Sequence, residues 1–351
     1  MTLDGVCVVR FRQLDAAPNG TKSAVGLEAN GGGRRSWLRA WDLRLALLAA
    51  TRASKLIGLS VREAVSVNAV TPVLGRGVWH AAARGVIDVV LHNLLCQTAS
   101  GPRSSRAAAL GARALLYADL PNRECTIPEL VDMVSRAVEH GFRAIKIHAA
   151  SSDRRDFLRR IQAAQSVCGG GEILADGFRE FRPREALQVA EGLISLGVHW
   201  FEEPVELAHL DTLLQEPGLH AMHIVAGEHV RGSDELETFL TTFPGSVVTP
   251  DVLMVGGMTG MQRAIDQAGR FNKELCFHGA QYPEIVASLS HPSWRPRYIA
   301  ALPHFDTRST CFEFGYRLKD GRLDDSQAVL DPSASGWKRI TIRSSDDRTR
   351  R

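Results

Sequence analysis

Short apolar runs that each end in charged residues recur along residues 144–279. The clearest runs are EILAD, VHWFEE, HIVAGE, SVVTPD and ELCFH, and their last charged positions are Asp176, Glu202 with Glu203, Glu228, Asp251 and His278. Successive run ends lie 23 to 27 residues apart. One strand, one helix and two short loops need about that length, so the spacing predicts a parallel β/α barrel. Functional residues of such a barrel lie at the C-terminal ends of its strands, which we call the barrel mouth.

Eight strands can be assigned in this pattern, from ALLYA at 114–118 to YIAAL at 298–302. Segments with a helical spacing of apolar residues lie between them. The helix expected over 126–141 has the clearest start, because Thr126 and Glu129 form the sequence signature of a capping box. Polar N-caps are also expected for three other helices, at Ser152, Ser233 and Thr259.

The first 112 residues follow a different pattern. Residues 1–35 alternate like the two strands of a hairpin, whereas residues 36–60 and 78–97 have helical spacing. These segments predict a small α+β domain that precedes the barrel. The chain is therefore expected to divide into this domain (1–112), the barrel (113–310), a segment with a hairpin that returns to the first domain (311–343) and a disordered tail (344–351).

Composition limits the partners and the compartment. The 351 residues are 44% hydrophobic, which is enough for a large core, and 42 basic residues nearly balance 39 acidic ones. This balance argues against nucleic acid as a partner, because phosphate binding needs a concentrated basic surface. The six cysteines form no C-x-x-C pair, and no apolar run reaches the ~18 residues of a membrane helix. With no signal-peptide pattern, we expect a cytoplasmic protein that binds no membrane.

Three carboxylates, Asp176, Glu202 and Glu228, end three successive predicted strands. Neighbouring strand ends lie side by side, so these carboxylates repel one another and raise one another's pKa. A hard divalent cation removes this repulsion, and Mg²⁺ prefers such oxygen ligands. The alternative is three solvated acids at the barrel rim. The regular spacing favours a Mg²⁺ site.

Two further pairs of residues flank the predicted metal site. Asp251 and His278 end the next two strands, and an Asp that bonds one ring nitrogen of a His makes the other nitrogen more basic. Lys146 and His148 are two apart on one strand, so both face the barrel mouth. Lys146 can neutralise a substrate carboxylate and His148 can transfer a proton. The alternative for this second pair is an ion pair with the carboxylates.

A metal site with proton-transfer groups on both sides indicates one class of reaction. The cation binds the carboxylate of a small substrate and stabilises the enediolate that forms when the α-proton leaves. The expected partner is therefore a small-molecule carboxylate.

Four stretches of the sequence resemble the enolase superfamily, in particular the mandelate racemase/muconate lactonizing enzyme group. They are WFEEP (200–204), VAGEHV (225–230), TPDVLMVGGMTG (249–260) and FHGAQ (277–281). The resemblance implies a (β/α)₇β barrel under an α+β capping domain, which the N-terminal region and the C-terminal tail form together, with a lid near residues 15–24. Family analogy also implies a homo-oligomer. The implied roles are Mg²⁺ ligands at Asp176, Glu202 and Glu228, a His–Asp dyad at His278 and Asp251, and the first Lys of a Lys-x-Lys motif at Lys146.

The sequence departs from the family pattern at two positions. His148 stands where the second Lys of the Lys-x-Lys motif, usually the base, is expected. Pro303 stands on the eighth strand where racemase-like members have a Glu that bonds the substrate carboxylate. Proline has neither a donor nor an acid group, so this contribution to stabilising the enediolate is lost.

The leading hypothesis is a Mg²⁺-dependent dehydratase of a hydroxy acid, most simply a sugar acid. His148 or Lys146 removes the α-proton, and His278, held by Asp251, protonates the leaving β-hydroxyl. The first alternative is a racemase or epimerase of a 2-hydroxy acid or a related carboxylate. It would use the same proton-transfer groups on the two sides of the metal site. The second is a divergent, non-catalytic metal-binding member, which Pro303 favours.

Overall fold

The computed structural model describes part of the chain, which divides into two compact units. One unit combines residues 1–100, 306–314 and 330–351, and the other combines 101–305 with 315–329. The predicted lid, the segment 101–113, Pro303 and the tail 344–351 lie outside the described residues. The domain boundaries expected from the sequence remain predictions. The described residues are 48–49, 51–53, 55–56, 59–70, 78–98, 114–120, 122–278, 296–301 and 317–324.

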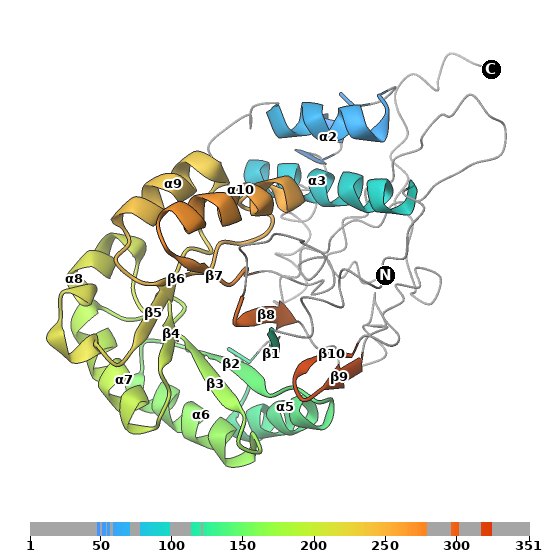
Figure 1. Cartoon of the computed structure of the whole chain (residues 1–351). Helices are drawn as coiled ribbons and strands as arrows, with labels where there is room; N and C mark the ends of the chain where they lie inside the picture. Colours follow the sequence, from blue (N-terminus) through green and yellow to red (C-terminus); the bar gives the residue numbers. More distant parts are fainter. Residues whose placement is uncertain are drawn as a thin grey trace. The chain divides into compact units, whose positions relative to one another are not determined.

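The larger unit is built on one curled sheet of eight parallel strands (Figure 1). Its strand order is β7-β6-β5-β4-β3-β2-β1-β8, so each strand from β1 to β7 lies beside its neighbour in sequence. Within the described residues no pairing joins β7 to β8. The α/β barrel fold and its eight strands were predicted correctly. The strands are β1 (Leu115–Asp119), β2 (Ala144–His148), β3 (Glu172–Asp176), β4 (Trp200–Glu202), β5 (His223–Ala226), β6 (Val247–Val248), β7 (Glu274–Leu275) and β8 (Tyr298–Ala301).

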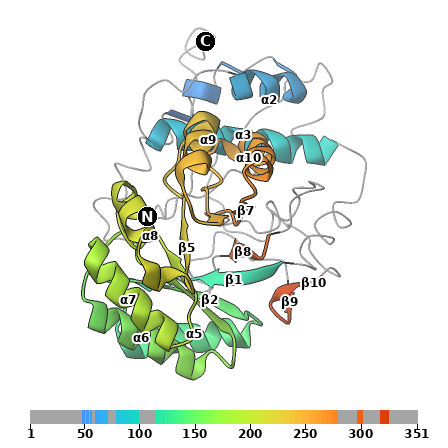
Figure 2. The ribbon, with the colours of Figure 1, turned by 60° about the vertical axis from the view of Figure 1, so that its left-hand side comes forward.

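Helices cover the outer side of this sheet (Figures 1 and 2). The capping box of α5 is confirmed, because the Thr126 amide donates to Glu129 Oε2 at 2.7 Å and the Glu129 amide to Thr126 Oγ1 at 3.4 Å. The helices are α5 (Ile127–Glu139), α6 (Arg154–Val167), α7 (Pro183–Ser195), α8 (Leu210–Leu214), α9 (Gly232–Thr242) and α10 (Gly257–Arg270), with 3₁₀ turns at Leu207–His209 and Pro217–Leu219.

Three predicted N-caps were wrong. Asp153, and not Ser152, caps α6. Its carboxylate accepts hydrogen bonds from the backbone N–H groups of residues 155 and 156, which have no partner inside the helix. Helix α9 already begins at a glycine, so Ser233 lies inside the helix. Helix α10 begins after the left-handed Gly256, which places Thr259 inside its first turn.

Side chains along β4 point alternately toward the outer helices and into the barrel interior. Phe201 packs against α6 and the loop before α7, with its ring 6.3 Å from that of Phe157 and 6.2 Å from that of Phe181. Successive strand residues point to opposite faces, so Trp200 and Glu202 lie on the other face. There the Trp200 ring meets the Tyr298 ring of β8 edge-on at 5.3 Å. Glu202 therefore points into the barrel, as its place in the sequence pattern predicted.

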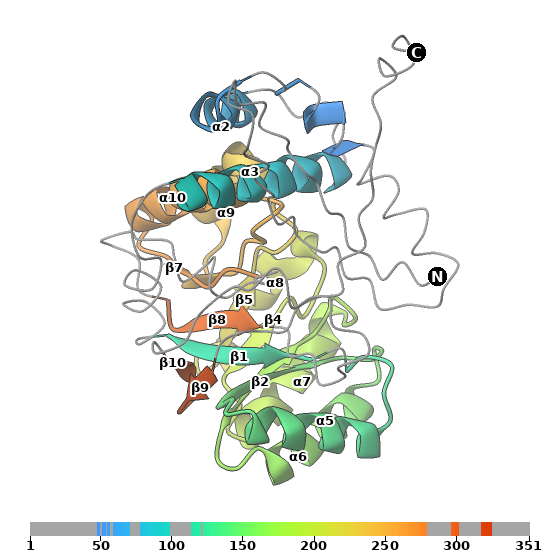
Figure 3. The same cartoon turned by 90° about the vertical axis from the view of Figure 1, so that its right-hand side faces the viewer.

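A short hairpin of β9 (Arg317–Lys319) and β10 (Arg322–Asp324) lies against β1 (Figure 3). The Leu116 amide donates to Gly321 O at 2.7 Å. The hairpin itself was predicted. Its residues belong to the barrel unit, and the expected return of the segment 311–343 to the first domain remains a prediction. The remainder of the segment 311–343 lies outside the described residues.

The smaller unit is described mainly by α2 (Val61–Val70) and α3 (Val78–Thr98). Helix α3 was predicted, whereas α2 lies beyond the helix expected over 36–60, of which residues 48–49 and 51–53 are helical. Polar groups join these segments: Arg52 Nε donates to Asn68 Oδ1 at 2.6 Å, and Asn68 Nδ2 donates to Arg84 O at 3.3 Å. Among the described residues, no helix is long and apolar enough to cross a membrane.

Candidate active site

The strand register places charged residues side by side at the barrel mouth. Asp119 pairs with Lys146 between β1 and β2, and Asp176 pairs with His148 on one side and with Glu202 on the other. An isolated parallel bridge joins Asp251 to His278, and Glu228 follows the end of β5. The structure thus places all seven predicted site residues at neighbouring strand ends.

Lys146 forms ion pairs with two of the three predicted metal ligands. Its Nζ lies 2.9 Å from Glu202 Oε2 and 3.4 Å from Asp176 Oδ2, and its side chain is fully buried. Burial alone would lower the pKa of Lys146, but Glu202 and the nearby Tyr117, Asp119 and Asp176 keep that pKa well above its usual value. The ammonium group therefore stays protonated. This is the ion pair that the sequence left open as an alternative.

His148 lies between two acids and an amide. Its Nε2 is 3.3 Å from Asp119 Oδ1 and 3.5 Å from Asp176 Oδ2, while its Nδ1 is 3.3 Å from Asn122 Oδ1. The Phe178 ring meets the imidazole edge-on, with ring centroids 6.0 Å apart. His148 therefore presents Nε2, and not Nδ1, to the strand-end carboxylates.

Asp119 is a site residue that the sequence reasoning missed. Its carboxylate lies between both predicted proton-transfer groups. Asp119 Oδ1 is 3.3 Å from His148 Nε2, and Asp119 Oδ2 is 4.0 Å from His278 Nε2. Burial raises the pKa of Asp119, but Lys146, His148 and His278 outweigh that effect and lower it. The run LLYAD ends in an acid in the same way as EILAD, so the strand-end rule contains the signal that finds it.

The predicted pair of Asp251 and His278 is present. Asp251 Oδ2 lies 3.3 Å from His278 Nδ1, and Asp251 Oδ1 accepts bonds from the Leu253 and Met254 amides. His278 Nε2 lies 3.0 Å from Glu228 Oε2. Burial would lower the pKa of His278, but Glu228 and the bond to Asp251 raise it to about 10. The imidazole is thus oriented by one acid and charged beside another.

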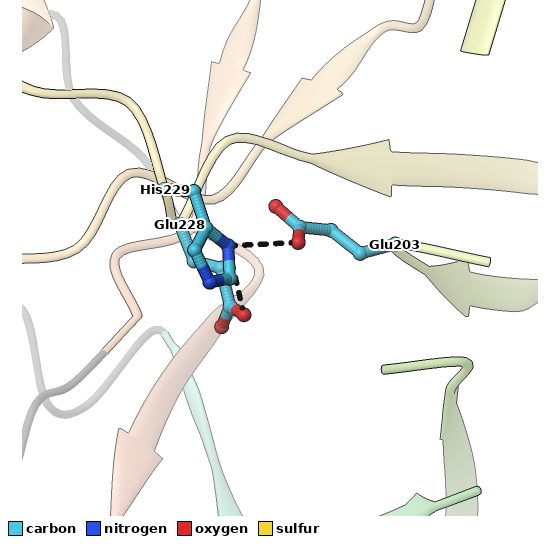
Figure 4. A group of neighbouring side chains, drawn as sticks. All are labelled: Glu203, Glu228 and His229. Atoms are coloured by element: carbon cyan, nitrogen blue, oxygen red, sulfur yellow. Dashed lines mark hydrogen bonds and ion pairs between the residues drawn. The ribbon is translucent and has the colours of Figure 1, made fainter. Parts of the chain in front are cut away.

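Glu203 and His229 form a tight group with Glu228, one of the predicted metal ligands (Figure 4). His229 Nδ1 lies 2.9 Å from Glu203 Oε2 and 3.2 Å from Glu228 Oε1. Burial, together with Glu203 and Glu202, raises the pKa of Glu228 against the opposing effect of His278. No role was predicted for His229 from the sequence. Its position depends on the loop after β5, which strand patterns do not specify.

Arg179 compensates the charge of Glu203. Its Nε lies 3.4 Å from Glu203 Oε2, and its Nη2 lies 2.8 Å from His229 Nε2. The Gly227 amide also donates to Glu203 Oε1 at 3.2 Å. Both oxygens of Glu203 are therefore occupied by groups of the protein, which makes this carboxylate a poorer candidate for a metal ligand than its neighbour Glu202.

The residues at the mouth fit a divalent cation. Glu202 Oε1 is buried and makes no hydrogen bond within the part of the chain that the structure describes. An unsatisfied buried carboxylate oxygen is costly, and coordination to a cation would satisfy it. Asp176 and Glu228 carry further carboxylate oxygens, the ligand type that Mg²⁺ prefers. Both oxygens of Glu228 lie beside histidines, His229 and His278, so this residue would have to exchange one of these contacts for the cation.

The fold and the mouth together define an α/β barrel with a carboxylate-rich, acid–base site at its strand ends. A family model described as "Enolase C-terminal domain-like" matches residues 129–335. The chain belongs to this family, within the mandelate racemase/muconate lactonizing enzyme group of the enolase superfamily. The resemblance seen in the sequence is thereby confirmed.

Two curated relatives illustrate the range of activities nearby. The L-talarate/galactarate dehydratase of Salmonella typhimurium is 22% identical over 211 residues, which cover 58% of this chain and 51% of that protein. The L-Lys-D/L-Arg epimerase of Methylococcus capsulatus is 23% identical over 253 residues, covering 69% of each. The chain thus matches about half the length of the dehydratase.

A solved structure shares the fold. It is a racemase from Streptomyces coelicolor with bound magnesium, with a TM-score of 0.70 and 19% identity, over 90% of this chain and 88% of that one. At this identity the likeness establishes the barrel fold.

Proposed function

We propose that this protein removes the proton α to the carboxylate of a hydroxy acid, most simply a sugar acid, and eliminates the β-hydroxyl as water. One observation carries the proposal. The Nε2 atoms of His148 and His278, on β2 and after β7, approach the same carboxylate, Asp119, at 3.3 and 4.0 Å. Two imidazoles that face one space from different strands can act on two bonds of one substrate. The dehydratase among the relatives supports this choice.

Asp176, Glu202 and Glu228 would hold Mg²⁺ in this proposal. When bound, the cation supplies positive charge for the oxygens of the substrate carboxylate, whose negative charge grows as the α-proton leaves. Lys146 adds a second fixed positive charge, because its ammonium stays protonated between Glu202 and Asp176. Full burial and these ion pairs make Lys146 a poor base, which leaves His148 as the group that accepts the proton.

The proposed reaction uses one proton transfer on each side. His148 Nε2 accepts the proton from the α-carbon, and the electrons of that C–H bond form a C=C bond. His278, which Glu228 and Asp251 keep protonated, gives its Nε2 proton to the β-hydroxyl, whose C–O bond breaks to release water. The resulting enol becomes a 2-keto acid. Asp119 lies between the two rings, near the Nε2 atoms that would act on the substrate.

Racemisation or epimerisation is the second candidate function. It requires a base and an acid on opposite faces of one carbon, and the same two histidines meet that need. The epimerase among the relatives favours it. The two candidates differ in whether the substrate carries a β-hydroxyl. The non-catalytic alternative rested on Pro303, which lies outside the described residues, and the named relatives are enzymes.

Compartment and assembly remain part of the proposal. A small carboxylate is the proposed substrate, and we propose a cytoplasmic homo-oligomer, the latter by family analogy alone. Sedimentation of the purified chain tests the assembly, and a monomer at micromolar concentration would exclude it.

A panel of hexonic, pentonic and aldaric acids, incubated with Mg²⁺ and scored for 2-keto acid, tests the function. We expect at least one acid to give 2-keto acid with the wild-type chain and none with Glu202→Gln. Epimeric product without keto acid would support the second candidate. No conversion of any acid by a chain that binds Mg²⁺ would support the non-catalytic alternative.

A further inference from the structure

Bulky residues adopt a strained backbone conformation directly after β3 and β4. Among the described residues other than glycine, a positive φ occurs at Phe178, Arg179, Glu203, Asn272 and Asp320. Asn and Asp tolerate this left-handed region, and Asn272 and Asp320 lie in the turns before β7 and between β9 and β10. The three bulkier residues all lie at the barrel mouth. Such strain persists only where the surrounding structure imposes it, and it often marks a functional site.

The turn that carries Phe178 is held by β3 and by the loop after β4. The Phe178 amide donates to Asp176 Oδ1 at 2.9 Å, and the Gly177 amide donates to Glu202 O at 2.7 Å. A Cβ atom at Gly177 would lie 2.5 Å from Pro204 Cα, so the two loops are in close contact. The φ of 50° at Phe178 is therefore imposed by packing against preference, because a bulky side chain disfavours it.

The Phe178 ring is held at the rim by a cation and an imidazole. The guanidinium carbon of Arg123 lies 3.8 Å from the ring centroid, and the His148 ring meets the Phe178 ring edge-on at 6.0 Å. Arg123 is itself fixed, because it pairs with Glu180 and its Nε donates to Ala149 O at 3.0 Å. Arg123 covers one face of the ring, yet Phe178 remains 39% exposed. The exposed part therefore lies on the side away from Arg123.

An exposed aromatic ring beside the proposed base must meet the substrate. For proton transfer, His148 Nε2 has to come within about 3–3.5 Å of the reacting group, so the carbon chain of the acid passes beside the Phe178 ring. We propose that Phe178 is a specificity-determining residue. Its ring contacts the substrate chain beyond the β-carbon and selects acids that present C–H groups there over acids with a second carboxylate. This inference rests on the proposed function, which places the α-carbon at His148.

The chemistry of the ring sets the direction of this selection. The face of an aromatic ring is its electron-rich side, so it attracts C–H groups and repels a carboxylate. A carboxylate that moves from water against an apolar ring also loses hydration that the ring does not replace. Arg123 does not reverse the preference, because Glu180 balances its charge and it covers the other face. A hydroxy acid with one carboxylate therefore fits this side of the mouth better than a diacid.

The competing explanation is that the ring serves only to pack against Arg123. Loss of the ring would then change stability, or weaken the binding of all acids equally. Two substitutions separate these roles. Phe178→Asn removes the ring, and Asn tolerates the left-handed backbone, so the turn can keep its shape. Phe178→Tyr keeps the ring.

Matched acids that differ only at the last carbon test the inference. Each hexonic acid of the substrate panel is compared with its 6-deoxy and aldaric counterparts, which carry CH₃ or COO⁻ in place of CH₂OH. Their binding is measured by titration calorimetry on the Mg²⁺-loaded full chain with His278→Asn, which should bind an acid without dehydrating it. With Phe178 present, the best monocarboxylate should bind at least about tenfold more tightly than its diacid, and Phe178→Asn should reduce this ratio to about threefold or less. Phe178→Tyr should retain it.

Kinetics with an otherwise wild-type chain supply the second readout. Phe178→Asn should raise KM for the preferred monocarboxylate about tenfold and leave kcat nearly unchanged, because the ring contacts a part of the substrate that does not react. The control is Val70→Asn, which replaces another exposed apolar side chain with the same polar one, on α2. It should alter neither KM nor the ratio between monocarboxylate and diacid.

Three results would overturn the inference. One is a diacid bound as tightly as its monocarboxylate by the chain that retains Phe178, which needs no substitution at this position. Another is a Phe178→Asn chain that keeps the ratio, and the third is a Mg²⁺-loaded chain that binds none of the matched acids. If the acids bind with the expected ratios but the wild-type chain converts none of them, the proposed function fails and recognition by Phe178 stands.

Discussion

Glu202 and Lys146 form the most deeply buried ion pair at the barrel mouth among the described residues, with Oε2 of the acid 2.9 Å from the ammonium nitrogen. Only one oxygen of the acid is compensated in this way, because Oε1 has no hydrogen-bond partner in the described part of the chain. A buried carboxylate that is half satisfied is destabilising, and a bound cation would complete its coordination.

Glu202→Gln and Asp176→Asn should each weaken Mg²⁺ binding. Each substitution removes a negative charge from the site but keeps the size of the side chain, so the affinity should fall at least about tenfold. Titration calorimetry with MgCl₂ measures the change. The matched control is Glu206→Gln. Glu206 is an exposed acid, and its side chain forms an ion pair with Arg179. Unaltered Mg²⁺ affinity in both site variants would remove these two carboxylates from the metal site.

Glu203→Gln should leave Mg²⁺ affinity within about threefold of the wild-type value. Arg179, His229 and the Gly227 amide already occupy its oxygens, so its charge is not available to the metal. The same calorimetric titration decides the point. If Glu203→Gln and His229→Ala lose the metal while Glu202→Gln keeps it, the site is formed by the group in Figure 4 instead.

His278→Asn should abolish turnover and leave Mg²⁺ affinity nearly unchanged. The imidazole is the proposed acid, and loss of a general acid typically costs about 10²–10⁴-fold in rate. Steady-state kinetics with the acid found in the substrate panel and a parallel Mg²⁺ titration separate the two effects. His220→Asn, at an exposed position after β4, serves as the control. Turnover that survives in His278→Asn would exclude the His–Asp pair from the chemistry.

Phe201→Ala should destabilise the barrel by about 3–5 kcal/mol, because it opens a cavity in a fully buried aromatic cluster. The rings of Phe157 and Phe181 line that cavity. Urea unfolding followed by circular dichroism gives the change in the free energy of unfolding. Thr241→Ala on the exposed side of α9 should stay within ~0.5 kcal/mol. If Phe201→Ala lost no more stability than Thr241→Ala, the cluster would not hold α6 and the loop before α7 to the sheet.

The capping box of α5 should give a pH-dependent contribution to stability. Hydrogen bonds from Thr126 lower the pKa of Glu129 below its usual value of 4.5. Because the pKa is lower in the folded chain, the contribution is present above about pH 4.5 and is lost as the pH falls through the folded pKa. The unfolding midpoints of the wild-type chain and Glu129→Ala should differ at pH 7 and converge at lower pH. In a Thr126→Ala background the difference at pH 7 should shrink, and a constant difference at all pH values would contradict the assignment.

The strand-end residues could be predicted because a parallel barrel ties position in the sequence to position in space. Each apolar run fixes a strand, and the residue that ends the run must reach the mouth. Asp176, Glu202, Asp251 and His278 were found in this way. Asp119 obeys the same rule. It was missed only because the first predicted strand, ALLYA, was ended at residue 118, one residue before it.

Residues on loops could not be found by that rule. Asn122 reaches His148 from a loop that buried Arg160 holds in place. His229 reaches Glu203 only through the turn after β5. Whether Lys146 meets a substrate or the carboxylates depends on side-chain packing across three strands. These contacts depend on tertiary structure, so spacing along the chain left them open.

Hydrogen–deuterium exchange at the α-carbon tests the central claim most directly. The acid found in the substrate panel is incubated in D₂O with Mg²⁺ and the His278→Asn chain, and its α-proton is followed by NMR. If His148 removes that proton and His278 serves only in the second step, the α-signal should disappear without formation of keto acid, and His148→Gln should abolish both exchange and turnover. An α-proton that persists in His278→Asn, or exchange that continues at the wild-type rate in His148→Gln, would contradict the account.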